Sequence, residues 1–210
     1  MSNGNVVILY SILTRPEGYI LIGDNKYDYA SDKEIIDLLR KHKKVMLCNY
    51  YQQSIDWLPN EITHLIIGTN FNKPLNNLPA SLKYLAFEPD GYYNLLTLFN
   101  NRLDNLPHGL EELQLAICGN NTYLGENLPS TLKKLYIFGF GSKNMINMNN
   151  FPDSIEFLYL DKICLEIDKI DRLPSNLKVF ESNDLNCVKD KYELFKTKFP
   201  NVIINLDGNL

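Results

Sequence analysis

The feature that most constrains this 210-residue chain is a recurring pattern, Leu-Pro-x-x-Leu-x-x-Leu-x-apolar, in which Ile or Phe sometimes replaces Leu. Alignment on this pattern places one proline in each copy, at Pro59, Pro79, Pro107, Pro129, Pro152 and Pro174. Successive prolines are 20, 28, 22, 23 and 22 residues apart by subtraction of these numbers. A period of this length indicates a repeat array in which neighbouring repeats must stack, because one repeat is too small to bury its own apolar side chains.

Apolar residues recur at fixed distances after each proline, and their spacing predicts a short strand in every repeat. Side chains alternate between the two faces of a strand, so the sixth and eighth residues after the proline share one face. We expect this face to point inward, where each buried side chain contributes roughly 1.5–3 kcal/mol. The third positions are Ile62, Leu82, Leu110, Leu132, Ile155 and Leu177; the sixth are Leu65, Leu85, Leu113, Leu135, Leu158 and Phe180; the eighth are Ile67, Phe87, Leu115, Ile137, Leu160 and Ser182.

The first 50 residues do not follow the repeat, and they predict a cap with the element order β-β-α-β. Two apolar runs, 6–10 and 19–22, flank a turn at Arg15-Pro16-Glu17-Gly18. The spacing of Ser31 and Glu34 matches a capping box, with Ser31 as the N-cap of a helix over about 32–42. A third strand is expected at 45–48. Such a segment would cover the exposed edge of the first repeat, which solenoids require.

The other end of the chain predicts a second cap. A helix is expected over 184–198, ending at Phe199-Pro200, and Ile203 and Leu206 keep the third and sixth positions after Pro200. The long spacing between Pro79 and Pro107 reflects extra residues at 89–99, which predict a longer loop or a short helix.

Together these patterns predict an α/β repeat fold with three parts. Residues 1–50 form the N-terminal capping segment, residues 51–183 form the repeats, and residues 184–210 form a C-terminal helix followed by a degraded capping repeat. The fold expected is a leucine-rich-repeat-like solenoid with a parallel strand ladder of about six to seven repeats.

A resemblance to a known family is carried by the segment Phe71-Asn72-Lys73-Pro74-Leu75-Asn76-Asn77-Leu78-Pro79. It resembles the FNIP repeat, a leucine-rich-like unit of about 22 residues that is abundant in Dictyostelium and in mimivirus and its relatives. The segments 99–107 and 51–59 match more loosely, and the resemblance covers roughly residues 50–183. It implies a giant-virus or amoebal origin. Family members often carry an F-box for ubiquitin ligation, but residues 1–50 open with strands, so that role does not carry over.

Composition and charge exclude several classes of partner. A formal charge of −4 and a pI near 5.4 disfavour nucleic-acid binding, which needs a basic face. No apolar run approaches the roughly 20 residues that span a bilayer, and the first ten residues lack the pattern of a secretory signal. The four cysteines form no CxxC pair, which disfavours a metal site. We therefore expect a cytoplasmic protein, in the host cytoplasm if the chain is viral, with the virion as an alternative.

The outward strand positions carry the candidate binding residues. At the fifth and seventh positions after the prolines stand aromatic and imidazole side chains, of which Tyr136, Phe157 and Tyr159 fall together, with Phe138 beside them if it points outward. Exposed aromatic clusters are typical anchors of protein interfaces. The alternative is that the rings only cover the sheet. The partner-binding candidates are Tyr84, Tyr136, Phe157, Tyr159 and His64.

Catalysis finds little support in the sequence. The three histidines, His42, His64 and His108, fall on separate elements, and no phosphate-binding loop, GxGxxG or HExxH motif is present. We therefore expect no catalytic residues, no metal and no cofactor, and a non-catalytic module that binds a protein partner, with an amoebal host as one source of that partner. The alternatives are a structural or virion-associated self-assembling protein and an enzyme or RNA binder that uses residues 1–50.

Overall fold

The structure is a computed structural model of the whole chain. The residues that the structure describes are 6–7, 18–23, 28–87, 99, 101–118, 128–140, 146–161, 163, 169–182 and 192–205. The chain forms two compact units, Met1–Leu110 (unit 1) and Glu111–Leu210 (unit 2), each with its own set of paired strands.

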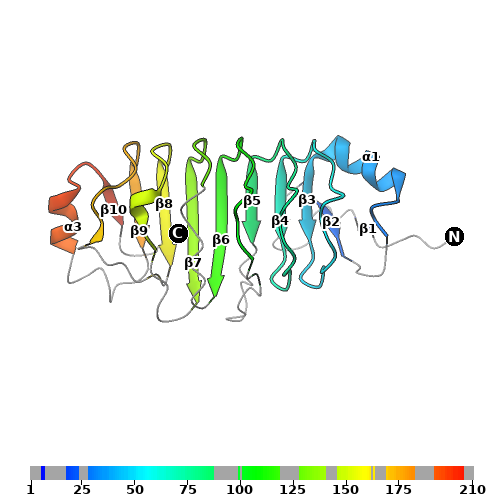
Figure 1. The fold of residues 1–210 in the computed structure, drawn as a ribbon, viewed down its shortest axis with the longest axis horizontal. Helices are drawn as coiled ribbons and strands as arrows, with labels where there is room; N and C mark the ends of the chain where they lie inside the picture. The colour runs from blue at the N-terminus through cyan, green and yellow to red at the C-terminus, as the bar shows by residue number, and fades with distance from the viewer. Residues whose placement is uncertain are drawn as a thin grey trace. The chain divides into compact units, whose positions relative to one another are not determined.

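Unit 1 contains the predicted β-β-α-β segment followed by strands of the array (Figure 1). Strand β1 pairs antiparallel with β2, and β2, β3, β4 and β5 then pair in parallel in chain order. Helix α1 connects β2 to β3, so this part of the sequence prediction is confirmed. The elements are β1 (Val6–Val7), β2 (Ile20–Ile22), α1 (Lys33–His42), β3 (Lys44–Leu47), β4 (His64–Ile67) and β5 (Tyr84–Phe87).

Unit 2 continues the same design. Strands β6 to β7, β7 to β8, β8 to β9 and β9 to β10 all pair in parallel, each with its neighbour in the chain. The elements are β6 (Glu112–Cys118), β7 (Lys134–Phe140), the 3-10 helix η1 (Met148–Asn150), β8 (Phe157–Asp161), β9 (Val179–Ser182), α3 (Tyr192–Lys198) and β10 (Ile203–Asn205). With one strand per repeat and parallel neighbours, the chain is a leucine-rich-repeat-like α/β solenoid, as the sequence predicts.

The prolines act at the turn that leads into each strand. In all six repeats the proline carbonyl accepts a hydrogen bond from the N–H of the third residue onward, at 3.0–3.2 Å. This bond closes a β-turn, and the apolar residue that donates it is carried into the core. The Pro-x-x-Leu spacing is therefore a turn requirement as well as a packing one. The donors are Ile62, Leu82, Leu110, Leu132, Ile155 and Leu177.

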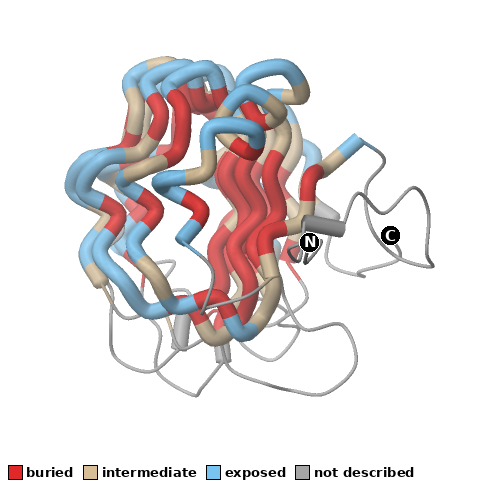
Figure 2. The backbone as a smooth tube through the Cα atoms, turned by 90° about the vertical axis from the view of Figure 1, so that its right-hand side faces the viewer, coloured by how far each residue is buried: buried red, intermediate tan, exposed pale blue. Residues whose placement is uncertain are grey.

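The inward ladder is buried throughout, as the spacing predicts. Every residue at the third, sixth and eighth positions after the six prolines is at most 6% exposed, including the polar Ser182 at 1%. Figure 2 shows buried residues concentrated along the strands and exposed residues at the turns. Each repeat therefore completes its core with side chains from the repeats beside it.

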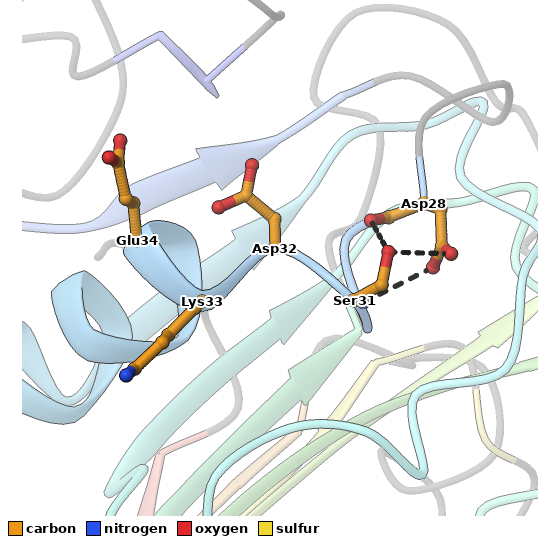
Figure 3. A pocket seen from close by; sticks show the side chains of 5 residues that line it. All are labelled: Asp28, Ser31, Asp32, Lys33 and Glu34. Atoms are coloured by element: carbon orange, nitrogen blue, oxygen red, sulfur yellow. Dashed lines mark hydrogen bonds between the residues drawn. The ribbon is translucent and has the colours of Figure 1, made fainter.

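The start of helix α1 differs from the prediction (Figure 3). The N-cap is Asp32 rather than Ser31, and its carboxylate accepts a hydrogen bond from the N–H of Ile35 at 3.0 Å. Ser31 instead donates its hydroxyl to the Asp28 carboxylate at 2.7 Å. Aspartate caps a helix as well as serine does, and Asp28 holds the serine one residue outside the helix.

Aromatic rings join the N-terminal segment of unit 1 to its first repeats. Tyr29 stacks on Trp57 with ring centroids 5.8 Å apart, and Tyr51 stacks on Phe71 at 6.4 Å. The Trp57 indole N–H donates to the Tyr51 hydroxyl, which donates in turn to the carbonyl of Ser54. Burial of this hydroxyl raises the pKa of Tyr51 to about 12.

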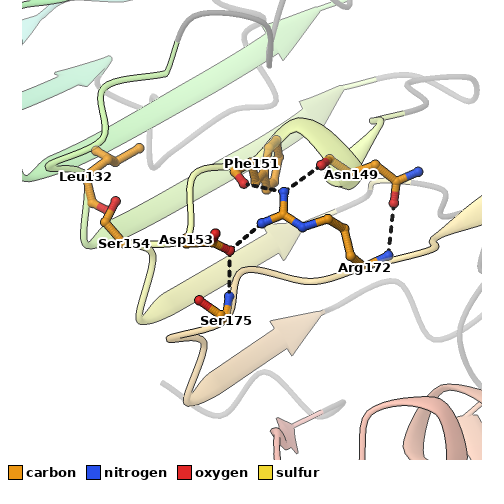
Figure 4. Close-up of polar contacts among 7 residues, drawn as sticks. All are labelled: Leu132, Asn149, Phe151, Asp153, Ser154, Arg172 and Ser175. Carbon is orange, nitrogen blue, oxygen red and sulfur yellow. Dashed lines mark hydrogen bonds and ion pairs between the residues drawn. The ribbon is translucent and has the colours of Figure 1, made fainter.

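On the loop side of unit 2, a polar network links successive repeats (Figure 4). The guanidinium of Arg172 donates to the backbone carbonyls of Asn149 and Phe151 and contacts the carboxylate of Asp153. Asp153 also accepts the N–H of Ser175 at 3.0 Å. That backbone bond, followed by the contact with Arg172, lowers the pKa of Asp153. The network holds the loop at residues 149–153 against the one at residues 172–175, at positions that the leucine pattern does not specify.

The last repeat corrects one prediction. Ile203 pairs with Val179, which stands at the fifth position of its own repeat, so Ile203 points outward and is 60% exposed. The turn accounts for one residue of this two-residue shift, because the carbonyl of Phe199, rather than that of Pro200, accepts the N–H of Val202. Helix α3 ends at Lys198, as expected, whereas 184–191, Leu206 and the segment 89–98 lie outside the described residues.

Candidate functional site

The outward face of unit 2 carries most of the predicted binding residues. Strand register places Tyr136 beside Tyr159 and Phe138 beside Asp161 on strands β7 and β8. The residue Phe157 lies next to Lys134 in the same pairing. Because alternate residues of a strand share a face, these side chains form one surface opposite the inward ladder. We call Tyr136, Phe138, Phe157 and Tyr159 the aromatic cluster.

The four rings of the aromatic cluster touch one another in tilted arrangements. The ring centroids of Tyr136 and Phe157 are 5.2 Å apart, those of Phe138 and Tyr159 are 5.4 Å apart, and those of Tyr136 and Tyr159 are 6.2 Å apart. Such geometry is favourable for aromatic pairs. Three rings are half-buried, but Tyr159 is only 6% exposed, so the expectation that it presents an exposed ring is wrong. Its two aromatic neighbours along β7 explain part of this burial.

Charged side chains surround the aromatic cluster. Lys134 forms an ion pair with Glu112 at 3.3 Å, and Glu112 raises the pKa of this lysine. At the other side, Glu181 lies next to Tyr159 on β9. The pKa of Tyr136 is raised, first by burial and then by the negative charge of Glu112. Glu181 also raises this pKa, and Lys134 opposes the two carboxylates. The phenol therefore sits in a negative potential.

The remaining predicted residues, His64 and Tyr84, lie on the outward face of unit 1. Their rings stack with centroids 5.7 Å apart, and Tyr19 meets His64 edge-on at 6.3 Å. The ammonium of Lys44 lies 5.7 Å from the centroid of the Tyr19 ring. Strand pairing aligns Lys44, His64 and Tyr84 on neighbouring strands. We call Tyr19, Lys44, His64 and Tyr84 the mixed row, because it combines aromatic rings with a cation and an imidazole.

The hydroxyl of Thr63 fixes the orientation of the His64 ring. It donates to the carbonyl of Lys43 at 3.2 Å and lies 2.8 Å from Nδ1 of His64. The contact with Thr63 thus holds the His64 ring in place on the sheet surface.

Sequence reasoning missed a buried layer on this outward face. Met46, Ile66 and Ala86 stand side by side on β3, β4 and β5 and are at most 6% exposed, with Tyr19, Leu21 and Tyr84 packed against them. Part of this layer could have been found, because Ile66 and Ala86 both stand at the seventh position of adjacent repeats, and Met46 on β3 extends the same column. Lys44 and Tyr19 were also missed, since they precede the first repeat and lay outside the alignment on proline.

Other polar features of the described chain are structural. A shallow depression at the start of α1 is formed by Asp28, Ser31, Asp32, Lys33 and Glu34 (Figure 3). Asp32 caps the helix, Asp28 accepts a bond from Ser31, and Glu34 lies in the first turn of the helix. Within the described ranges, no group of three or more His, Cys, Asp or Glu side chains is placed to hold a metal ion. No helix among the same residues is both long and apolar enough to cross a membrane.

Comparison with known proteins identifies the repeat. The model of the FNIP repeat family matches residues 51–89, which include Tyr51 and Phe71 at the start of two repeats. A solved structure described as that of CroV588, a circular LRR protein, is 27% identical, with a TM-score of 0.46. The match covers 67% of this chain but only 24% of that one. No curated protein matches the chain.

Proposed function

Because this chain is an FNIP-repeat, leucine-rich-repeat-like protein, we propose that it is a non-catalytic interaction module that binds a partner protein through the outward face of unit 2. Stacked repeats of this kind create extended surfaces whose outward side chains can vary while the inward ladder maintains the fold. An amoebal host and a cytoplasmic location, both drawn from the sequence, determine the choice of lysate for the test.

The observation that carries this proposal is the aromatic cluster. Aromatic side chains are concentrated at the centres of protein interfaces, where large rigid rings lose little conformational entropy on binding. The outward face of a sheet that only needed to be soluble would carry polar side chains, as Glu112, Gln114 and Lys134 do at the edge of the cluster. Three half-buried rings between such residues are better explained by a surface that a partner covers.

The chemistry of the described residues supports a binding role over a catalytic one. Among them, the acids with lowered pKa values are Asp153 and Glu156, and both are engaged in links between repeats. Glu156 owes its shift first to a hydrogen bond from Lys178 on the next repeat. Acids whose pKa is lowered by contacts between neighbouring repeats have a structural role, whereas a catalytic acid must lie next to a nucleophile or a bound substrate.

The proposal is tested by affinity capture from amoebal lysate, with the double variant Tyr136→Ser, Phe157→Ser compared against the parent chain. Tyr159 is left unchanged because it is buried, and its loss would confuse binding with folding. The matched control, His64→Ser with Tyr84→Ser, removes two rings from the mixed row of unit 1. We expect a partner that is lost with the unit 2 variant and retained with the control, verified by titration with the purified partner. Equal retention by both variants contradicts the proposal.

A second candidate function is self-association, which the exposure of Ile203 favours. This side chain on β10 is 60% exposed and continues the outward column of Phe157 and Val179. Exposed apolar side chains on strands invite pairing with another chain. Ile203→Lys should then abolish any concentration-dependent dimer seen by sedimentation, whereas Tyr50→Lys, at a residue that is 74% exposed in unit 1, should not. A parent chain that stays monomeric at high concentration excludes this candidate.

A further inference from the structure

We propose that the aromatic cluster of unit 2 takes a cationic side chain, Lys or Arg, from an extended basic segment of the partner protein. The inference rests on the proposed function and adds the chemistry of the partner. It follows from the positions of the acids around the rings, which strand register determines.

The outward face of unit 2 has a regular layout. Along β8, the outward residues are Phe157, Tyr159 and Asp161, and the neighbouring strands place Phe138 beside Asp161 and Glu181 beside Tyr159. Neighbouring strands lie about 5 Å apart, so each of these carboxylates stands one strand spacing from a ring of the cluster. A cation above the rings would therefore meet carboxylates from β8 and β9 together.

The charges of this face are unequal. At the outward strand positions around the rings, the described charged residues are Glu112, Lys134, Asp161 and Glu181, and their charges sum to −2. The cation among these four, Lys134, lies on the side of Glu112, and the two form an ion pair at 3.3 Å. The other side carries the two carboxylates of Asp161 and Glu181. The negative charge of Glu181 reaches the rings, since it raises the pKa of Tyr136 in addition to burial and the larger effect of Glu112.

The faces of the aromatic rings add to the preference for a cation. The faces of Phe and Tyr rings carry the negative part of a quadrupole and attract cations within about 6 Å of the centroid. The centroids in the cluster are 5.2 to 6.2 Å apart, so one ammonium or guanidinium group can contact two rings at once. An acidic segment would face both the rings and the carboxylates unfavourably, whereas a cationic one is attracted by both.

The mixed row of unit 1 provides an internal reference for this chemistry. It also presents two tyrosine rings, but its central positions are Lys44 and His64. Lys44 already occupies the Tyr19 ring with its own cation at 5.7 Å. In unit 1 a lysine of the chain itself therefore lies over a tyrosine ring, whereas in unit 2 carboxylates flank the rings.

The test uses three fluorescent twelve-residue peptides in which Ser alternates with Arg, Gln or Glu. Each is titrated into the full chain at low salt. We expect the Arg peptide to bind, the Gln peptide to bind at least tenfold more weakly, and the Glu peptide not to bind. The double variant Asp161→Asn, Glu181→Gln and the single variant Tyr136→Leu should each weaken binding of the Arg peptide about tenfold. Tyr136→Phe, which keeps a ring, should retain the parent affinity.

Two matched controls separate a site from the general charge of the chain. Glu34→Gln with Asp37→Asn, both exposed on α1, changes the net charge as much as the acidic variant does. Tyr84→Leu removes a half-buried ring from unit 1. Neither should alter the affinity for the Arg peptide by more than twofold, and far-UV circular dichroism should show that every variant folds.

Failure of this inference is distinct from failure of the proposed function. If the Arg peptide does not bind, or if the α1 control weakens it as much as the acidic variant, the cationic partner is overturned. A captured partner can also be lost with Tyr136→Ser, Phe157→Ser but keep its affinity for Asp161→Asn, Glu181→Gln. That result would support the interaction surface of the proposed function and overturn the inference that the partner contributes a cation. A partner that depends on neither pair of residues overturns both.

Discussion

The two units share an inward face and differ in their outward one. In both, the third, sixth and eighth residues after each proline are buried, and the same turn leads into each strand. On the outward face, unit 1 buries Met46, Ile66 and Ala86 against Tyr19 and Tyr84 of the mixed row, whereas unit 2 pairs Lys134 with Glu112 and gathers four rings. The repeat thus dictates the core but does not constrain the outward columns, and it is there that the units can acquire different roles.

The largest effect should be equal in the two units, because it concerns the face that they share. Leu85→Ala in unit 1 and Leu135→Ala in unit 2 each remove a fully buried side chain and should cost about 2–5 kcal/mol of unfolding free energy. Urea denaturation measures both, with the fluorescence of Trp57 reporting on unit 1 and far-UV circular dichroism on the whole chain. A cost below about 1 kcal/mol in either unit would contradict the conclusion that the inward positions are packed equally well in both units.

A second prediction concerns alkaline pH and sharpens the comparison at the core of unit 1. Tyr51 is 0% exposed, and its pKa is raised from 10.0 to about 12. Between these values the unfolded chain loses this proton while the folded chain keeps it, so stability is complete below pH 10 and falls as the pH rises toward 12. The loss approaches about 2.7 kcal/mol.

The matched variant for this prediction is Tyr51→Phe. It lacks the hydroxyl that Trp57 and Ser54 contact, so it should be less stable at pH 8 by about 1–2 kcal/mol. It should also lose less stability than the parent chain on going from pH 10 to pH 12, because all other tyrosines are common to both. Parallel pH profiles of the two proteins, followed by Trp57 fluorescence, would show that Tyr51 keeps an ordinary pKa.

The third prediction tests the outward faces directly. Ile66→Thr in unit 1 changes a side chain that is 6% exposed and should cost about 1–3 kcal/mol. Gln114→Thr changes the corresponding outward position of β6 in unit 2, where the side chain is half-buried and polar, and should stay within about 0.5 kcal/mol. Thermal melts of both variants provide the measurement. Equal costs would show that the two outward faces are equally buried and remove the main difference between the units.

The sequence predicted most of the fold because the fold depends on short-range regularities. The proline turn, the alternation of strand side chains and the period of the repeat are local, and together they placed Leu65, Leu113 and Leu158 in the core. The N-cap of α1 was misplaced by one residue, since Ser31 and Asp32 are both good caps and only Asp28 decides between them. Ile203 was misplaced because β10 leaves the proline register: Phe199 closes the preceding turn, and Ile203 pairs with Val179, two positions beyond the expected one.

The candidate site was less predictable because it depends on what lies across several strands. Alignment of the repeats placed Tyr136, Phe157 and Tyr159 together, and the structure confirms the ring contacts. It did not reveal that Tyr159 is buried, since exposure on an outward face depends on the size of all its neighbours. Nor did it reveal Arg172, whose bonds to the loop of the preceding repeat reach back more than 20 residues.

The smallest effect should come from the cations of the two outward faces. Lys134 in unit 2 pairs with Glu112 at 3.3 Å, and about half of its side chain is exposed, so Lys134→Gln should cost only about 0.2–1 kcal/mol. Its pKa is raised by Glu112, which means that its stabilisation is complete below its unfolded pKa and is lost as the pH rises through the folded one. Lys44 in unit 1 contacts the uncharged ring of Tyr19 instead.

Dependence on salt should separate these two cations. The cost of Lys134→Gln should vanish in 1 M NaCl, where the Debye length is about 3 Å, while that of Lys44→Gln should persist, because the ring of Tyr19 carries no net charge to be screened. Urea denaturation of both variants at 0.05 M and 1 M NaCl provides the measurement. An equal response to salt would mean that the cations of the two units are held by the same kind of contact, and the outward faces would then differ in their rings alone.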